Sequence, residues 1–134
     1  MGLLNIFKAD HDGVRRSHIK NLISVAMADG RLDREEWDLV VAIARLLGMS
    51  DQEIEVIRQN PENVKFVAPK KYEDKVQQIH DLVALITIDG EINERELAVC
   101  RKISLRLDIL PQMVDDIISQ IMQPESSSPP TFPQ

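Results

Sequence analysis

Apolar residues recur at helical spacing along most of the chain. From Ile19 to Ala26 they follow steps of three and four residues, and the pattern ends at Gly30, a residue type favoured just past the end of a helix. The segment from Trp37 to Leu47 is apolar on nearly all sides, which is typical of a central, buried helix. The pattern therefore predicts two helices here, the second of which lies in the core.

A short third helix and an irregular connector come next. Ser50 and Glu53 form a capping-box pair at the start of this helix, and Asn60-Pro61 ends it. Residues 60–69 then consist largely of Pro, Asn, Lys and isolated apolar residues. This composition predicts a connector, and its single partly extended stretch implies no sheet.

Three more helices are predicted after the connector. The first runs from Tyr72 to just before Gly90, and the second runs from Glu94 to about Leu107. The third begins at Pro111, because proline fits the first turn of a helix. We therefore expect an all-α fold, a compact bundle of about five to seven helices. The expected buried centre consists of Trp37, Val40, Ala44, Val83, Ile86, Cys100, Ile103 and Ile118.

The chain repeats itself at an offset of 60 residues (89 minus 29). Residues 18–57 align with residues 78–117 without a gap, and each half contains a helix, the motif D-G-x-[LI]-[DN]-x-x-E and a second helix. Two halves that each leave an apolar face uncovered are expected to pack on one another. The sequence therefore predicts two helical repeats related by an approximate two-fold axis.

A length of 134 residues fits one domain, flanked by two terminal segments. The last residues are rich in Ser and Pro and cannot contribute to a core, so we expect a flexible tail. The expected parts are an N-terminal segment (1–17), a helical domain (18–123) with repeat one (18–57), connector (58–69) and repeat two (70–122), and the tail (124–134).

Charge and hydropathy exclude several classes of partner. The chain has 22 acidic and 16 basic residues, a formal net charge of -6, so it lacks the basic surface that nucleic acids require. No apolar run approaches the about 20 residues that span a bilayer, and the chain does not start like a secretory signal. We expect a cytoplasmic protein, with at most peripheral membrane contact through Leu3 to Phe7.

Each D-G motif resembles the second half of an EF-hand calcium loop. If Glu36 takes position twelve, Asp29 falls at position five and Asp33 at position nine. Positions one and three would be Val25 and Met27, which supply no carboxylate, so an ordinary EF-hand is excluded. The candidate metal ligands of the two loops are Asp29, Asp33, Glu36, Asp89, Asn93 and Glu96.

The same residues also fit a junction between two helices. Asp33 and Asn93 stand where N-cap residues are expected, and Glu36 and Glu96 follow three residues later, as in a capping box. Each cap would contribute about 1 kcal/mol. Capping alone would therefore account for the two glutamates without any cation.

Asp29 and Asp89 are harder to explain by capping. An acidic residue at the end of a helix opposes the negative end of the helix dipole by about 0.3–1 kcal/mol. A bound cation, a basic neighbour such as Arg31 or Arg34, or the positive start of the following helix could offset this charge. These three explanations remain open at the level of sequence.

The motifs A-D-G-R-L-D-R-E-E-W and I-D-G-E-I-N-E-R-E-L, placed on two helical repeats, resemble the TerB-like tellurite-resistance family. The resemblance covers residues 18 to about 122. It implies an all-α fold, duplicated acidic loops proposed to bind metal, and a link to stress-response assemblies at the inner face of the membrane. It implies no catalytic activity. The chain departs from the usual Ala or Ser before the second Asp-Gly, where it has Ile88.

Features of common enzymes are not found in the sequence. His11, His18 and His80 share no metal-ligand spacing, and no Glu-x-x-His pair of the di-metal enzymes occurs. Tellurite reduction needs thiols or a redox cofactor, and the single Cys100, predicted to be buried, supplies neither. We therefore expect a non-catalytic module that binds calcium or magnesium weakly and docks on protein partners. The alternatives are a metal-dependent enzyme that uses clustered carboxylates and a membrane-surface scaffold.

Overall fold

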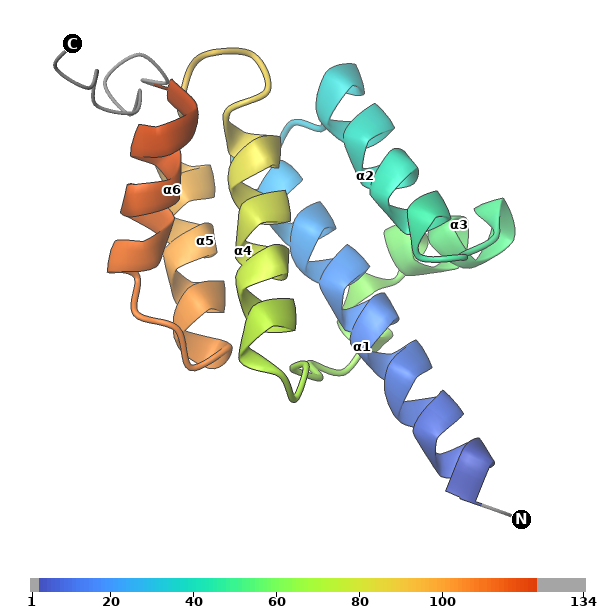
Figure 1. The fold of residues 1–134 in the computed structure, drawn as a ribbon. Coiled ribbons are helices and arrows are strands. Elements are labelled where there is room, and N and C mark those ends of the chain that lie inside the picture. Colours follow the sequence, from blue (N-terminus) through green and yellow to red (C-terminus); the bar gives the residue numbers. More distant parts are fainter. Residues whose placement is uncertain (1–2, 123–134) are drawn as a thin grey trace, which may run out of the picture.

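The computed structural model describes the backbone of residues 3–122 and the side chains of residues 11–122, and within them it is all-α (Figure 1). The helices form a compact bundle, which confirms the predicted fold class, and the expected tail lies outside the described residues. The elements are α1 (Leu3–Ala26), α2 (Arg34–Leu46), α3 (Asp51–Gln59), the 3-10 helix η1 (Pro61–Asn63), α4 (Tyr72–Ile86), α5 (Glu94–Arg106) and α6 (Gln112–Met122).

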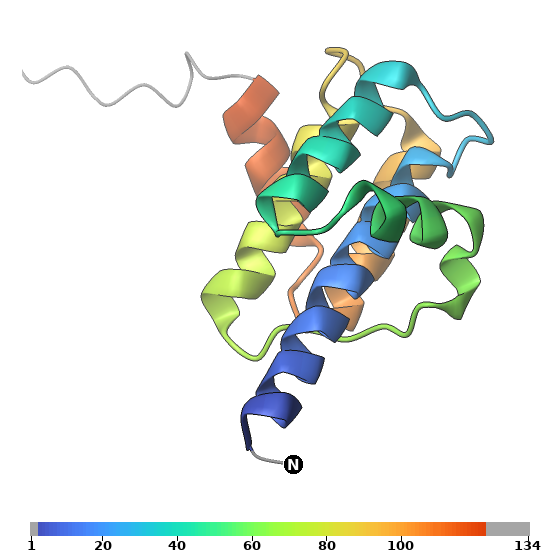
Figure 2. The same ribbon diagram turned by 90° about the vertical axis from the view of Figure 1, so that its right-hand side faces the viewer.

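Helix α1 is the central element that joins the two halves of the bundle. It runs between α2 and α3 on one side and α4 and α5 on the other, and it packs on all four helices (Figures 1 and 2). Its residues Ile19, Leu22 and Val25 are fully buried. The halves therefore pack on one another through α1, as the repeat predicts.

Helix α1 begins at Leu3, far earlier than the apolar pattern predicts, and its first turns extend beyond the other helices (Figure 2). The connector packs against α1 on both sides of the predicted start at Ile19. The Oγ of Ser17 accepts a hydrogen bond from the backbone N–H of Val67 at 2.9 Å, and Lys20 donates to the carbonyl of Val64 at 2.9 Å. Ser17 is buried at this contact, although its polar side chain suggests exposure in the sequence.

The two repeats share their local geometry. Helices α2 and α5 begin at positions related by the offset, and Gly30 and Gly90 end the preceding turns with φ of 85° and 82°. The left-handed residue that follows α2 is Gly48, whereas its counterpart after α5 is Asp108, with φ of 61°. Glycine takes this conformation without strain, and aspartate is among the few other residues that tolerate it.

The core agrees with most of the expected buried centre. Val40, Ala44, Val83, Ile86, Cys100 and Ile103 are buried, whereas Trp37 and Ile118 are only partly buried. Trp37 stays partly exposed because it lies at a groove between α2 and α3, where the guanidinium of Arg58 sits 4.9 Å from the ring centre. Burial, followed by the charge of Glu96, raises the pKa of Cys100 to about 12, so this thiol stays protonated. None of the described helices has the length and apolar character needed to cross a membrane.

Candidate functional site

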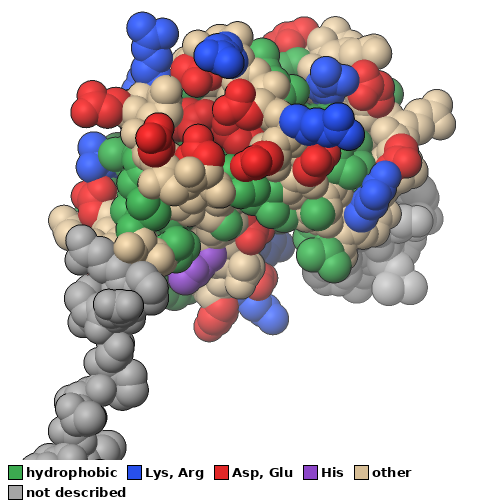
Figure 3. Space-filling view, turned by 90° about the horizontal axis from the view of Figure 1, so that it is seen from above, with side chains coloured by type: hydrophobic (Ala, Val, Ile, Leu, Met, Phe, Trp, Pro, Cys, Tyr) green, Lys and Arg blue, Asp and Glu red, His purple; other side chains and the backbone are tan. Residues whose placement is uncertain are grey.

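The two D-G loops meet at one end of the bundle, the upper end in Figure 1. Seen from that end, acidic side chains gather on the surface (Figure 3). Between the loops lies a hollow of about 210 Å³, called here the loop hollow. All six residues proposed from the sequence line it, together with two further neighbours: Asp29, Asp33, Glu36, Asp89, Asn93 and Glu96, with Glu91 and Ile92.

Asp29 and Asp89 fold their own loops in the same way. The Oδ1 of Asp29 accepts a hydrogen bond from the backbone N–H of Arg31 at 3.0 Å, and the Oδ1 of Asp89 accepts one from Glu91 at 3.0 Å. Such a bond closes an Asx turn directly after the preceding helix. Each helix-end charge is therefore partly offset by a backbone donor of the turn, which leaves its second oxygen for other contacts.

Asn93 ties the two loops together. Its Nδ2 donates to the Oδ2 of Asp29 at 3.4 Å, a contact between the first repeat and the second. Its Oδ1 accepts from the backbone N–H groups of Arg95 at 2.9 Å and Glu96 at 3.1 Å. Asn93 therefore caps α5 as predicted and also fixes the position of the first loop.

The predicted cap by Asp33 and both predicted capping boxes at these loops are wrong. Asp33 occupies the N-cap position of α2, but its side chain accepts no capping hydrogen bond. It lies beside Glu36 in the loop hollow, and Glu36 and Glu96 also turn into that hollow instead of back to the N-cap residues. The capping box of Ser50 and Glu53 at α3, in contrast, is confirmed.

The difference between the two caps predicts different effects of two matched substitutions. Asn93→Ala should lower the free energy of unfolding by about 1 kcal/mol, because α5 loses a side-chain cap. Asp33→Ala should leave stability unchanged or raise it, because a charge beside Glu36 and Glu96 is removed and no cap is lost. Urea denaturation of both variants at pH 7 measures this difference. Equal losses in the two variants would contradict it.

Glu36 and Glu96 form a buried carboxyl pair. Their residues are only 6% and 4% exposed, and their side chains hydrogen-bond to each other. Burial, then the bond and charge of Glu96, then Asp33 raise the pKa of Glu36 from 4.5 to about 8. Burial and the charges of Asp29 and Asp89 also raise the pKa of Glu96. At neutral pH the pair therefore holds a proton.

One oxygen of this pair has no partner. The Oε2 of Glu36 is buried and accepts no hydrogen bond from any described residue. A buried carboxylate oxygen without a donor is costly, and two carboxyls in contact need a proton or a cation between them. The loop hollow thus contains an acceptor that the chain itself does not satisfy.

The donor set of the loop hollow suits a hard cation. Its polar side chains are carboxyls and one amide, and no Cys, His, Ser or Lys lines it. Oxygen donors of this kind bind calcium and magnesium, whereas softer metals prefer nitrogen and sulfur. Within residues 11–122, however, no three His, Cys, Asp or Glu side chains already stand close enough to hold a metal ion. Binding would require the carboxylates around the hollow to move closer together.

Sequence reasoning missed the contact between Glu36 and Glu96, although it proposed both residues. The offset placed the two glutamates at equivalent positions of the repeats. Equivalent positions near a two-fold axis face one another, so the repeat itself was the signal that could have predicted their pairing. Glu91 and Ile92, which also line the loop hollow, carried no signal of their own.

Among the comparisons with known proteins, a family model matches the part of the chain that contains the first repeat. The family model of tellurite resistance protein TerB matches residues 3–59, a range that contains α1, α2, α3 and the first D-G loop. No curated protein and no solved structure matches the chain. The second repeat lies outside the matched range, and its likeness to the first rests on the shared motif, helix positions and turn geometry.

Proposed function

From the premise that the chain is TerB-like, a module of the tellurite-resistance type, we propose that it is a non-catalytic protein that binds a divalent cation in the loop hollow. The observation that carries this proposal is the buried Glu36–Glu96 pair with an unpartnered carboxyl oxygen. A divalent cation would replace the shared proton and satisfy that oxygen. The bound cation would neutralise the carboxylates of Glu36 and Glu96, which come from different repeats.

Calcium fits the donor set better than magnesium does. Calcium accepts six to eight oxygen ligands in flexible arrangements, whereas magnesium demands a near-ideal octahedron. Asp29, Glu36, Asp89 and Glu96 would provide carboxylate oxygens, and Asn93 would provide an amide oxygen only by giving up its cap. Water would complete the shell, so we expect weak binding, with a Kd of roughly 0.1–1 mM, as in extracellular calcium modules.

Binding should compete with protons. Metal ligands must be deprotonated, and the pKa of Glu36 is raised to about 8. The apparent affinity for calcium should therefore rise between pH 6 and pH 8. Cation binding of this kind would change the charge and rigidity of the bundle end at which the two D-G loops meet. A protein partner could bind one of these two states in preference to the other.

The proposal predicts a stabilisation by calcium that depends on the loop aspartates. At 10 mM calcium and pH 8, the free energy of unfolding should rise by about 1.4–2.7 kcal/mol, as expected for a ligand that binds only the native state. The double substitution Asp29→Asn and Asp89→Asn should abolish the rise, because it removes two carboxylates from the loop hollow. Thermal unfolding with calcium and with chelator measures the effect.

A matched control removes the same number of negative charges from positions outside the loop hollow. Glu35→Gln together with Glu94→Gln also deletes two acidic residues from the first turns of α2 and α5, but both side chains lie outside the loop hollow. This control should retain the response to calcium. Calorimetry without heat from calcium, magnesium, manganese or zinc at millimolar concentrations would rule out the proposed cation site.

A further inference from the structure

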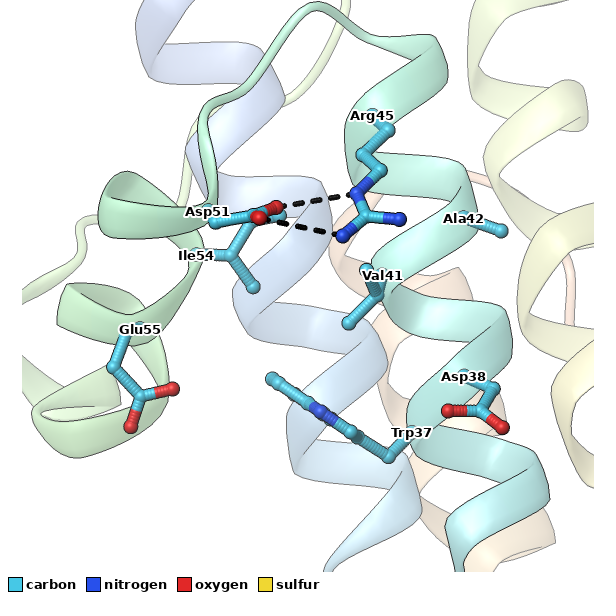
Figure 4. Close-up of a pocket in the computed structure, with 8 residues that line it drawn as sticks. All are labelled: Trp37, Asp38, Val41, Ala42, Arg45, Asp51, Ile54 and Glu55. Atoms are coloured by element: carbon cyan, nitrogen blue, oxygen red, sulfur yellow. Dashed lines mark hydrogen bonds and ion pairs between the residues drawn. The ribbon is translucent and has the colours of Figure 1, made fainter.

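A second hollow lies between α2 and α3 and shares no lining residue with the loop hollow (Figure 4). Its volume is about 460 Å³, and we call it the α2–α3 groove. Trp37 and Val41 on α2 and Ile54 on α3 provide its apolar surface, whereas Asp38 and Glu55 provide carboxylates (Figure 4). The groove therefore combines an aromatic ring, aliphatic groups and negative charge.

One end of the groove is closed by an ion pair. Arg45 donates to both carboxylate oxygens of Asp51, at 3.1 and 3.3 Å, so these two charges neutralise each other. The charge that remains belongs to Asp38 and Glu55. Asp38 lies 4.0 Å from Arg34, with both side chains largely exposed, and Glu55 lies 3.5 Å from Arg58 on its own helix. These are weak, solvent-screened pairs, and the open groove stays negative.

The second repeat shows what occupies the equivalent place. By the offset, Val41 corresponds to Arg101 and Glu55 corresponds to Asp115. The Nη2 of Arg101 donates to the Oδ1 of Asp115 at 2.8 Å, so a guanidinium bridges α5 and α6. Val41 is too short and apolar to make this bridge in the first repeat. The first repeat keeps the carboxylate but lacks a guanidinium that bridges its two helices, because Glu55 contacts only Arg58 of its own helix, at 3.5 Å.

We propose that the α2–α3 groove receives an arginine side chain from a basic segment of a partner protein. The guanidinium would bind Glu55 as Arg101 binds Asp115, and its aliphatic part would lie along Val41 and Trp37. Arginine suits this place because its planar guanidinium binds carboxylates with paired hydrogen bonds and also stacks on aromatic rings. The Trp37 ring already holds the guanidinium of Arg58 at 4.9 Å.

Charge and exposure support the same occupant. The chain carries a net charge of -6, which favours encounters with a basic partner. Trp37 is partly exposed in spite of its size, and tryptophan together with arginine dominates the binding energy of many protein interfaces. The proposal concerns a different surface from the cation site, so either could fail while the other holds.

The groove can be tested with its own reporter. Trp37 is the single tryptophan of the chain, so its fluorescence reports on the groove. We expect a saturable fluorescence change with a short amidated peptide that carries two arginines. The same peptide with citrulline in place of arginine should bind about ten-fold more weakly, because a charge-assisted hydrogen bond is lost. Added salt should weaken the binding of the arginine peptide.

Two variants separate the groove from general electrostatics. Val41→Arg copies the ion pair of the second repeat into the first. It should weaken peptide binding about ten-fold or more, because the new arginine side chain fills the groove. Glu55→Gln should weaken it about ten-fold, whereas Asp115→Asn, the matched change in the second repeat, should leave binding unaltered. Equal binding by wild type and Glu55→Gln, equal binding of the citrulline peptide, or no saturable binding up to millimolar peptide would each overturn the proposal.

Discussion

Replacing Glu36 by glutamine should raise the stability of the metal-free protein at pH 8 by on the order of 3 kcal/mol. The pKa of Glu36 is raised from 4.5 to about 8 in the native state, so between these values the native state binds more protons than the unfolded chain. The stability that Glu36 contributes is therefore fully present below pH 4.5 and is lost as the pH rises towards 8. Glutamine stays neutral and can donate a hydrogen bond to Glu96, so the variant avoids this loss.

Urea denaturation at several pH values in the presence of chelator measures this effect. The wild-type free energy of unfolding should decrease from pH 5 to pH 8, and the decrease should be much smaller in Glu36→Gln. Glu35→Gln is the matched control, because Glu35 is the exposed neighbour on the same helix turn. A wild-type profile that is flat or rises over this range would show that the pair holds no proton.

The second large effect concerns the core shared by the two repeats. Leu22→Ala in the first repeat and Leu82→Ala in the second should each lower the free energy of unfolding by about 2–5 kcal/mol. Both residues are at most 1% exposed and occupy equivalent positions of α1 and α4. Because α1 packs on helices of both repeats, each substitution should shift one common unfolding transition.

The single tryptophan makes the common transition easy to follow. Trp37 reports on the first repeat, and far-ultraviolet circular dichroism reports on all helices. Both signals should shift together in the Leu82→Ala variant. Leu105→Ala is the control, because Leu105 is 58% exposed and should cost less than about 1 kcal/mol. If Leu82→Ala left the unfolding transition followed by Trp37 fluorescence unchanged, the repeats would unfold independently.

The helices and their order could be predicted because the local signals agree. Gly30 and Gly90 end turns where the sequence places them, and Ser50 with Glu53 caps α3. The start of α1 was missed because the polar residues before Ile19 give no apolar stripe. Of residues 11–18 only Ser17 and His18 are buried, and their partners, Val67 of the connector and Asp81 of α4, are distant in sequence.

The residues proposed from the sequence lie together around the loop hollow, but their orientation was missed and their role as metal ligands stays a prediction. The D-G motif identified six of the eight residues around the loop hollow, since duplication placed two acidic clusters at the same end of the fold. Whether a glutamate turns back to a cap or into a hollow depends on what stands opposite, and Glu36 meets Glu96 from the other repeat. Trp37 was assigned to the core because helical periodicity does not show that α2 and α3 leave a groove.

The origin of Glu36 and Glu96 in different repeats has a consequence for stoichiometry. A single repeat would contain half of the acidic pair and would have to associate with a second copy to complete it. The fraction of complete pairs would then depend on the protein concentration. In the duplicated chain the connector holds both halves together, which gives an effective concentration of roughly millimolar or higher. The complete pair therefore exists in every molecule, at any dilution, with one acidic pair for each polypeptide.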